Sequence, residues 1–265
     1  MNALLFDCDG VLGDTERDGH LPAFNTAFAE FGLPLRWSRP EYCIKLAIGG
    51  GKERLASVFT PEFMREAKLP EDAESTKDLI ARLHERKTEI FTELVEAGKV
   101  PPRPGVARLA HGVHGLGWRL AVASTSTLRS VRAVLATVVG PDFAKAFEIY
   151  AGDVVPRKKP APDIYEYALE RLGIDSEHAI VVEDSHIGLR AALGARLCTI
   201  VTLSAFTQDE DVRGAALVVS SLGEPGAEPI VVRANDSGID VGSYVSVEDV
   251  VGLLATPSLP SRLST

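Results

Sequence analysis

The 265-residue sequence has few cysteines, no excess of basic residues and no apolar run long enough to cross a membrane. Its three cysteines, Cys8, Cys43 and Cys198, are odd in number and lack the spacing of a metal site, which indicates a reducing compartment. The formal net charge of −9 argues against a nucleic-acid or anionic-membrane surface, so we expect neither as a partner. Residues 1–3 lead directly into an apolar segment, and we expect no signal or transit peptide ahead of it.

The composition is that of an ordinary globular protein, with 45% apolar and 25% charged residues. Outside one helical block, short apolar runs typical of buried strands alternate with amphipathic patterns typical of helices. This alternation predicts an α/β fold with a doubly wound parallel sheet. The expected strands are the run that begins at Leu4 and the segments Arg119–Ala123, Ile149–Ala151, Ala179–Val182 and Leu197–Val201.

The helical block spans residues 14–100 and carries no strand pattern. Helical periodicity is clear in Asp14–Leu33 and Glu74–Glu96, and a glycine run at Gly49–Gly51 opens a further helix. A stiff, proline-rich linker at Pro101–Gly105 ends the block. We therefore expect a helical cap domain of residues 14–100, inserted into a core domain of residues 1–13 and 101–265.

The last part of that core, residues 221–265, is poorly defined by its sequence pattern. Gly223–Ala227 has the composition of a loop, Ile230–Val232 is a candidate edge strand and Val247–Leu254 a candidate last helix. The segment Pro257–Thr265 is expected to be frayed.

Two carboxylates stand at the end of the first apolar run, in the stretch Leu4–Gly13. Asp7 ends the run, Asp9 follows after one residue, and Gly10 turns the chain, so both side chains can approach one small volume. The carboxyl ends of parallel strands form the functional edge of such sheets. One carboxylate is then placed to attack and bind a metal while the other moves protons. The alternative is a helix cap or a local Asx-turn.

Three more strand ends carry polar residues. Ser124, Thr125 and Ser126 would form an anion cradle at a helix start, or Ser124 a simple N-cap. Glu183 and Asp184 follow a buried strand, where carboxylates need a partner or a metal, and hard oxygen ligands suit Mg²⁺.

The fourth group is a lysine in a turn stiffened by two prolines, Lys158-Lys159-Pro160-Ala161-Pro162. A fixed ammonium there would clamp a phosphate and screen the neighbouring carboxylates. The alternative is a solvated pair of lysines.

These four sites, D-C-D-G-V at Asp7, the strand end at Ser124, K-P-A-P-D at Lys159 and E-D-S at Glu183, resemble the four motifs of the haloacid dehalogenase-like phosphotransferases. Their order and spacing match across roughly residues 4–220, and the helical block resembles the C1 cap of that superfamily. Within the cap, D-T-E at Glu16, Tyr42, G-G-K-E-R from Gly50 and L-H-x-x-K from Leu83 are similar to the CbbY family. Those are Rubisco-associated phosphatases that remove the inhibitor xylulose-1,5-bisphosphate.

The resemblance implies a role for each core residue. Asp7 would attack phosphorus and form an aspartyl-phosphate, and Asp9 would act as acid and then as base. Mg²⁺ would be held by Asp7, the Asp9 carbonyl and Asp184, with Glu183 in or next to the coordination shell. Ser124 and Lys159 would bind the transferred phosphate, and Thr125 and Ser126 belong to the same substrate-binding loop.

The resemblance also implies that the cap selects the substrate and closes during the reaction. Glu16 would bind sugar hydroxyls, and His20, Arg54 and Lys87 would hold a second phosphate. The remaining candidates for substrate binding are Tyr42, Gly50, Gly51, Lys52, Glu53 and His84. The alternative is that Tyr42 and His84 pack inside the cap and that residues 52–54 form a solvated helical turn.

From this resemblance we expect a Mg²⁺-dependent sugar-bisphosphate phosphatase that converts xylulose-1,5-bisphosphate to xylulose-5-phosphate, or else a phosphatase of another small sugar phosphate. It would act as a monomer on a small phosphorylated sugar and reach Rubisco only through the inhibitor. The compartment would be the chloroplast stroma in a plant or alga, or the cytoplasm in a bacterium.

A β-phosphoglucomutase has the same four motifs and cap type and is the alternative. Asp9 argues against a receiver-like domain and a 2-haloacid dehalogenase, both of which lack this second acid. Gly13 and Thr127 depart from the family pattern and leave fine specificity open.

Overall fold

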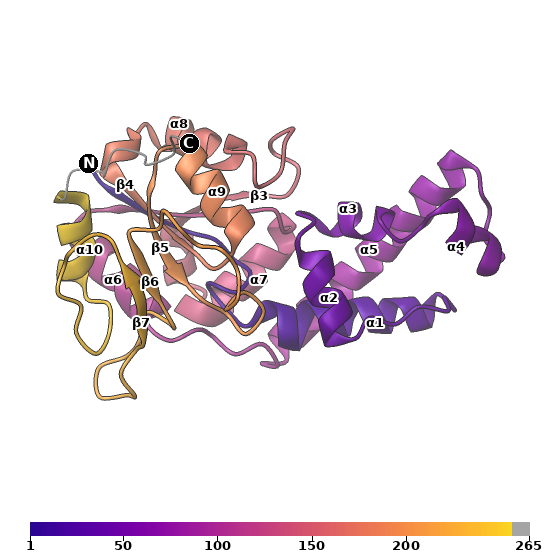
Figure 1. The fold of residues 1–265 in the computed structure, drawn as a ribbon, viewed down its shortest axis with the longest axis horizontal. Helices are drawn as coiled ribbons and strands as arrows, with labels where there is room; N and C mark the ends of the chain where they lie inside the picture. Colours follow the sequence, from indigo (N-terminus) through magenta and orange to yellow (C-terminus); the bar gives the residue numbers. More distant parts are fainter. Residues whose placement is uncertain (256–265) are drawn as a thin grey trace. The chain divides into compact units, whose positions relative to one another are not determined.

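The computed structural model describes residues 1–255, which divide into two compact units (Figure 1). The first unit joins Met1–Asp14 to the chain from Pro102 onward, and the second is Thr15–Pro101. No helix among the described residues is both long and apolar enough to span a bilayer.

The first unit is built on a seven-stranded sheet with the order β3-β2-β1-β4-β5-β6-β7. The first six strands run parallel, whereas β7 pairs antiparallel with β6 at the edge. The expected α/β fold with a doubly wound, mostly parallel sheet is confirmed, and β7 adds an antiparallel strand at its edge. The strands are β1 (Ala3–Phe6), β2 (Arg119–Ser124), β3 (Phe147–Ala151), β4 (Ala179–Glu183), β5 (Cys198–Thr202), β6 (Leu217–Val219) and β7 (Val232–Asn235).

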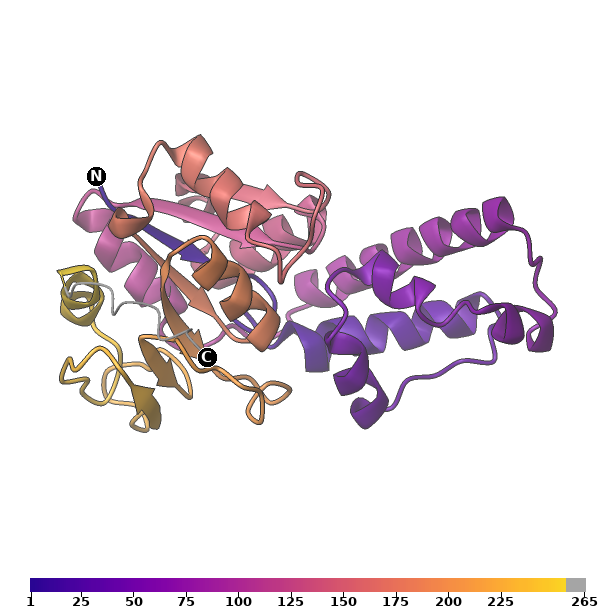
Figure 2. The same ribbon diagram turned by 45° about the horizontal axis from the view of Figure 1, so that its top comes forward.

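Helices cover both faces of this sheet, which is why the central strands are apolar on both sides. Helices α8 and α9 pack against each other on one face, while α6 contacts both α7 and α10 on the other (Figures 1 and 2). Leu5 of β1 pairs with Ala121 and Val181 and lies in the core beneath α8 and α9. The helices are α6 (Val106–Gly115), α7 (Leu128–Val139), α8 (Asp163–Leu172), α9 (His186–Gly194) and α10 (Val247–Ala255), with short 3₁₀ turns η2 (Phe143–Ala146) and η3 (Ser176–His178).

The second unit, residues 15–101, is described throughout and contains helices and loops but no strand. Its longest helix packs along the one that carries Phe24 and Phe28, and these rings join Trp37 and Tyr42 in an aromatic core. A capping box between Ser38 and Glu41 starts a regular helix in a segment whose pattern was mixed. The elements are the π-helical turn η1 (Glu16–His20), α1 (Leu21–Glu30), α2 (Arg39–Leu46), α3 (Gly51–Ala56), α4 (Pro61–Glu66) and α5 (Ala73–Glu96).

The described part of the C-terminal segment, residues 221–255, belongs to the first unit and packs against its helix α6. The guanidinium of Arg108 donates hydrogen bonds to the carbonyls of Leu222, Gly223 and Val245 and lies over the ring of Tyr244. The edge strand is β7, slightly later than the expected Ile230–Val232, and the last helix begins at Val247 as expected. The segment Pro257–Thr265, expected to be frayed, lies outside the described residues.

The chain leaves the sheet after β1 and returns to it at an adjacent point. Gly13 and Pro102 form an antiparallel bridge, and the amide of Arg103 donates to the carbonyl of Leu12 at 3.0 Å. The points at which the chain leaves and re-enters the first unit, residues 12–13 and 102–103, are therefore held together by backbone hydrogen bonds within that unit.

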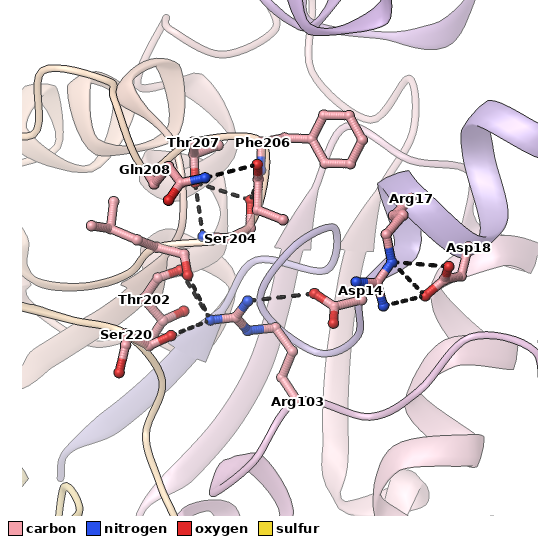
Figure 3. A network of polar contacts seen from close by, with 12 residues as sticks. Asp14, Arg17, Asp18, Arg103, Thr202, Ser204, Phe206, Thr207, Gln208 and Ser220 are labelled. Carbon is pink, nitrogen blue, oxygen red and sulfur yellow. Dashed lines mark hydrogen bonds and ion pairs between the residues drawn. The ribbon is translucent and has the colours of Figure 1, made fainter. Parts of the chain in front are cut away.

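Arg103, only 9% exposed, fastens this return point to two neighbouring strand ends (Figure 3). Its Nη2 donates to the carbonyls of Leu203 at 3.0 Å and Ser220 at 2.9 Å, and its Nη1 lies 3.5 Å from Asp14 Oδ1. The buried guanidinium therefore supplies hydrogen bonds to two carbonyls that are partly withdrawn from water.

We expect Arg103→Met to lower the free energy of unfolding by about 2–4 kcal/mol, because it removes the charged donor that these part-buried carbonyls share and the ion-pair partner of Asp14. Urea unfolding followed by circular dichroism measures the change. Arg190→Met, at an exposed position on α9, is the matched control and should change stability by less than about 0.5 kcal/mol. Equal midpoints for the two variants would contradict a stabilising role for Arg103.

Candidate active site

Asp7 stands at the carboxyl end of β1, where the strand order of the sheet changes direction. Its amide donates to the carbonyl of Val182 at 2.9 Å, so the pairing with β4 continues to the residue that leaves the sheet. Gly10 then turns the chain with a φ of 75°, and a Cβ at this position would lie 2.0 Å from Asp184 Oδ2. Both the conformation and the lack of space require glycine here. Asp7 and Asp184 therefore face the same small volume.

The ammonium of Lys159 ties three strand ends together. Its Nζ donates to Asp7 Oδ1 at 2.7 Å, to Glu183 Oε1 at 2.7 Å and to the Ala123 carbonyl at 3.0 Å. The side chain is 5% exposed, so these bonds form away from bulk water. Lys158 instead contacts the rim of the loop through Gly152 and Asp153. The alternative of two solvated lysines was therefore wrong for Lys159.

Glu183 and Asp184 are buried at the end of β4. Glu183 accepts hydrogen bonds from Lys159 and from the hydroxyl of Tyr165, in the first turn of α8. A Cβ on Gly188, in the first turn of α9, would lie 2.0 Å from Glu183 Oε2. The sequence E-D-S-H-I-G therefore places a glycine where the glutamate needs room.

Three carboxylates, those of Asp7, Glu183 and Asp184, each offer an oxygen within 4.8 Å of the others. Burial raises the pKa of Asp7 to about 7, against the attraction of Lys159 and with added repulsion from Glu183 and Asp9. Burial and the charges of Glu183 and Asp7 likewise raise the pKa of Asp184, although a hydrogen bond from Ser204 and the charge of Arg103 oppose this. The carboxylates of Asp7 and Glu183, in turn, outweigh burial and raise the pKa of Lys159.

One ammonium is thus bonded to two of these three buried acids, Asp7 and Glu183, and ionising all three calls for a further positive charge. The donors are hard carboxylate oxygens, which suit Mg²⁺ better than a soft metal. The arrangement fits the predicted magnesium site, with Asp7, Asp184 and Glu183 as the side chains that the structure brings together.

The loop after β2 contains the expected hydroxyl groups. Ser124 is 1% exposed, and its Oγ accepts from the Ser126 amide at 3.1 Å. The helix N-cap is Thr127, whose Oγ1 accepts from the Ser130 amide. The alternative role of Ser124 as an N-cap was therefore wrong. Ser126 donates its hydroxyl hydrogen bond to the carboxylate of Asp9, so it holds a candidate proton carrier, and Thr125 lies between the two serines.

Within the second unit, the charged candidates form two groups, in which His20, Arg54 and Lys87 are buried and Glu16 is half-buried. Arg54 Nη1 donates to the hydroxyl of Tyr42 at 2.8 Å, and that hydroxyl donates to Glu16 Oε2 at 2.5 Å. Lys87 Nζ lies 2.7 Å from His20 Nδ1, and the imidazole stacks on Phe91 with a centroid distance of 4.0 Å. These contacts fix the side chains of Glu16, His20, Arg54 and Lys87 in defined positions.

The other candidates of the second unit surround the start of α3. Gly50 has a φ of 96°, and a Cβ on Gly51 would lie 2.6 Å from His84 Nε2. Lys52 and Glu53 are on the exposed first turn, as the alternative of a solvated turn expects, but Arg54 is 8% exposed. Tyr42 is fully buried in the aromatic core, which agrees with the packing alternative, yet its hydroxyl also joins Arg54 to Glu16.

Sequence reasoning missed Tyr165, Arg103 and Ser204. Tyr165 lies in the same stretch as Lys159, and its position in the first turn of a helix that follows the lysine loop was an available signal. Arg103 and Ser204 are in a linker and a loop where no sequence pattern identifies their partners.

A sequence profile described as haloacid dehalogenase-like hydrolase matches residues 1–196. The chain therefore belongs to the haloacid dehalogenase-like hydrolases. It is 47% identical over 227 residues to a CBBY-like protein of Arabidopsis thaliana, which covers 86% of this chain and 71% of the relative. It is also 42% identical over 234 residues to Protein CbbY of Cupriavidus necator, covering 87% and 89% of the two chains.

A crystal structure of CbbY from Rhodobacter sphaeroides in complex with phosphate resembles this fold with a TM-score of 0.74 and 40% identity, covering 85% of this chain and 96% of the other. A mutant of the same protein in complex with xylulose-(1,5)bisphosphate matches with the same score and identity. The expected resemblance to the CbbY family is thereby confirmed. The chain is a phosphatase of this family, which hydrolyses phosphate esters of sugars.

We expect Mg²⁺ to raise the melting temperature, and to do so more at pH 8 than at pH 5. Because the pKa values of Asp7 and Asp184 are raised on folding, their contribution to stability is present at low pH and is lost as pH rises through the folded-state values. A cation that pairs with the ionised carboxylates restores it, by about 2.7 kcal/mol at a Mg²⁺ concentration of about 100 times Kd.

Thermal unfolding with MgCl₂, against KCl of equal ionic strength, measures this effect. Asp184→Asn should remove most of the Mg²⁺-dependent shift while the protein remains folded. A shift as large in Asp184→Asn as in the unchanged protein, or a larger shift at pH 5, would show that the ion binds elsewhere.

Proposed function

We propose that this phosphatase removes one phosphate from a sugar bisphosphate, with xylulose-1,5-bisphosphate as its substrate, through a covalent intermediate on Asp7. The observation that carries the proposal is the placement of Asp7, whose Oδ1 accepts from Lys159 at 2.7 Å beside two further buried carboxylates. A salt bridge for stability alone does not need a third buried acid, Asp184, beside the two that already share one ammonium. A site that binds a metal and a phosphoryl group does.

In the first step, an Asp7 oxygen attacks phosphorus and the bond from phosphorus to the sugar oxygen breaks. Lys159 supplies positive charge to the phosphoryl oxygens, and the Ser124 loop supplies hydroxyl and amide donors. Asp9 gives its proton to the departing sugar oxygen. In the second step, Asp9 takes a proton from the water that attacks phosphorus, and the Asp7 carboxylate is released together with phosphate.

The hydrogen bond from Ser126 to Asp9 supports this assignment. It orients the carboxyl group that carries the proton and leaves the Asp7 carboxylate to act as nucleophile. Ser126 thus contributes by holding Asp9, in addition to its expected place in the phosphate-binding loop.

Asp7, Asp184 and the Asp9 carbonyl would hold Mg²⁺, with Glu183 in or next to the shell. When bound, the ion neutralises the phosphoryl oxygens and allows an anionic nucleophile to approach an anionic substrate. The chain's own part is to keep three carboxylates close in a buried site, which Gly10 and Gly188 permit by leaving space for Asp184 and Glu183.

We propose that residues 14–100 serve as the cap domain and choose the substrate. Arg54, Lys87 and His20 would bind the second phosphate, and Glu16 the sugar hydroxyls. The contacts that fix these side chains support this role, because groups already fixed lose little entropy when a ligand binds. This part of the site would be completed by the start of α3 and by His84 of α5, which lies beside Gly51. The residues at the start of α3 are Gly50, Gly51, Lys52 and Glu53.

The substrate is proposed from the relatives, since a CbbY structure is described in complex with xylulose-(1,5)bisphosphate. Its removal would protect Rubisco indirectly, with no contact between the two proteins. We propose a monomer that works in the chloroplast stroma of a plant or alga, or in the cytoplasm of a bacterium.

A panel of sugar phosphates tests the proposal. With Mg²⁺, we expect phosphate release from xylulose-1,5-bisphosphate at a kcat/KM at least about tenfold above that for ribulose-1,5-bisphosphate or xylulose-5-phosphate, since about 1.4 kcal/mol of selective binding gives that ratio. Conversion of β-glucose-1-phosphate to glucose-6-phosphate would favour the mutase alternative instead.

The variant Arg54→Met keeps an unbranched side chain and removes the guanidinium with its charge. It should raise KM for the bisphosphate and reduce its preference over the monophosphate, whereas Arg65→Met, on α4 and exposed, should not. Equal rates on every monophosphate would reject the specificity and leave the phosphatase chemistry in place.

We expect Asp7→Asn to reduce turnover by at least about 10⁴-fold, because an amide cannot act as the nucleophile. The same change removes one negative charge from a crowded site, so the melting temperature without Mg²⁺ should be unchanged or higher. Phosphate release and thermal unfolding measure the two effects. Turnover near that of the unchanged protein would remove Asp7 from its proposed role.

A further inference from the structure

Tyr165 is a fully buried tyrosine that contacts the candidate site through its hydroxyl group. The hydroxyl donates to Glu183 Oε1, the same oxygen that accepts from Lys159 Nζ at 2.7 Å. The ring lies against the same ammonium, with its centroid 4.8 Å from Nζ. One side chain therefore touches both the lysine and the carboxylate that competes for the lysine.

The hydrogen bonds around Lys159 use its full capacity. An ammonium has three protons, and the three acceptors are Asp7, Glu183 and the Ala123 carbonyl. The two carboxylates compete for one charge at equal distances of 2.7 Å. Any change that strengthens the attraction of Glu183 for Lys159 weakens the bond that Lys159 makes to Asp7.

The Tyr165 hydroxyl acts on this competition. A neutral donor to Glu183 Oε1 satisfies part of the carboxylate's charge and occupies one of the two lone pairs on that oxygen. The Glu183 carboxylate then attracts the Lys159 ammonium less strongly. With phenylalanine at this position, Lys159 would be the remaining donor to Oε1, and its ammonium would shift its interaction from Asp7 toward Glu183.

We propose that Tyr165 is a positioning residue, whose hydroxyl shares Glu183 with Lys159 and so keeps the lysine charge available to Asp7 and to the phosphoryl group. This inference rests on the roles proposed above for Asp7 and Lys159. The hydroxyl affects phosphate binding through Lys159. The aromatic ring packs in the core beneath α8, and this packing alone cannot replace the hydrogen bond of the hydroxyl.

The test compares Tyr165→Phe with Tyr167→Phe. Both changes remove one hydroxyl group from α8, and Tyr167 is partly buried against Tyr150 away from the lysine. Inorganic phosphate is the probe, titrated by calorimetry in the presence of Mg²⁺, and steady-state kinetics give kcat and KM. We expect Tyr165→Phe to weaken phosphate binding and lower kcat/KM by about tenfold, the range for a hydrogen bond to a charged group. Tyr167→Phe should change either value less than about twofold.

A second comparison uses Glu183→Gln, which keeps the shape of the side chain and removes its charge. Once residue 183 carries no charge that competes for Lys159, the Tyr165 hydroxyl should have little effect on the interaction between Lys159 and Asp7. We expect Tyr165→Phe to weaken phosphate binding by less than about twofold in the Glu183→Gln background, which is strong non-additivity for neighbours in one network. If the Glu183→Gln variant does not fold, the comparison with Tyr167→Phe decides alone.

The proposal is overturned if phosphate binds Tyr165→Phe and Tyr167→Phe equally well. It is also overturned if the tenfold loss persists in the Glu183→Gln background, because the hydroxyl would then act independently of Glu183. A failure of the proposed function would look different, since Asp7→Asn would retain turnover whatever the effect of Tyr165→Phe.

Discussion

The attraction between the Lys159 ammonium and the carboxylates of Asp7 and Glu183 is the interaction on which the functional edge of the first unit depends. It links the ends of β1 and β4 and the loop before α8, and a third bond to Ala123 adds the end of β2. Removing these charged groups from water costs free energy, so each one is stable in the buried site only because a group of opposite charge lies beside it. The same crowding that disfavours three acids prepares the site for a divalent cation and a phosphoryl group.

Much of this arrangement follows from local sequence signals. Apolar runs that stop at acids or hydroxyls predicted β1, β2 and β4, and parallel topology alone then brings Asp7, Ser124 and Glu183 to one edge. The proline-stiffened turn around Lys159 completed the prediction. The strand β6 escaped notice, and the edge strand β7 was expected about two residues too early, because a short edge strand has little periodicity and is defined mainly by its neighbours.

Side-chain partners far apart in the sequence were beyond such reasoning. The bond from Ser126 to Asp9, and those from Arg103 to the carbonyls of Leu203 and Ser220, depend on how loops meet in space. Tyr42 shows the same limit in another form. Its pattern fitted both packing and function, and the structure gives it a buried ring as well as a hydroxyl that joins Arg54 to Glu16.

The bridge between Gly13 and Pro102, with the bond from the Arg103 amide to Leu12, has a consequence for how such a protein can change over evolutionary time. Because these contacts close the gap in the sheet unit by themselves, the helical segment between them is topologically one long surface loop. Lengthening a loop costs only about 0.6 kcal/mol for each doubling. New recognition elements can therefore be exchanged at this junction while strand register and chemistry stay as they are.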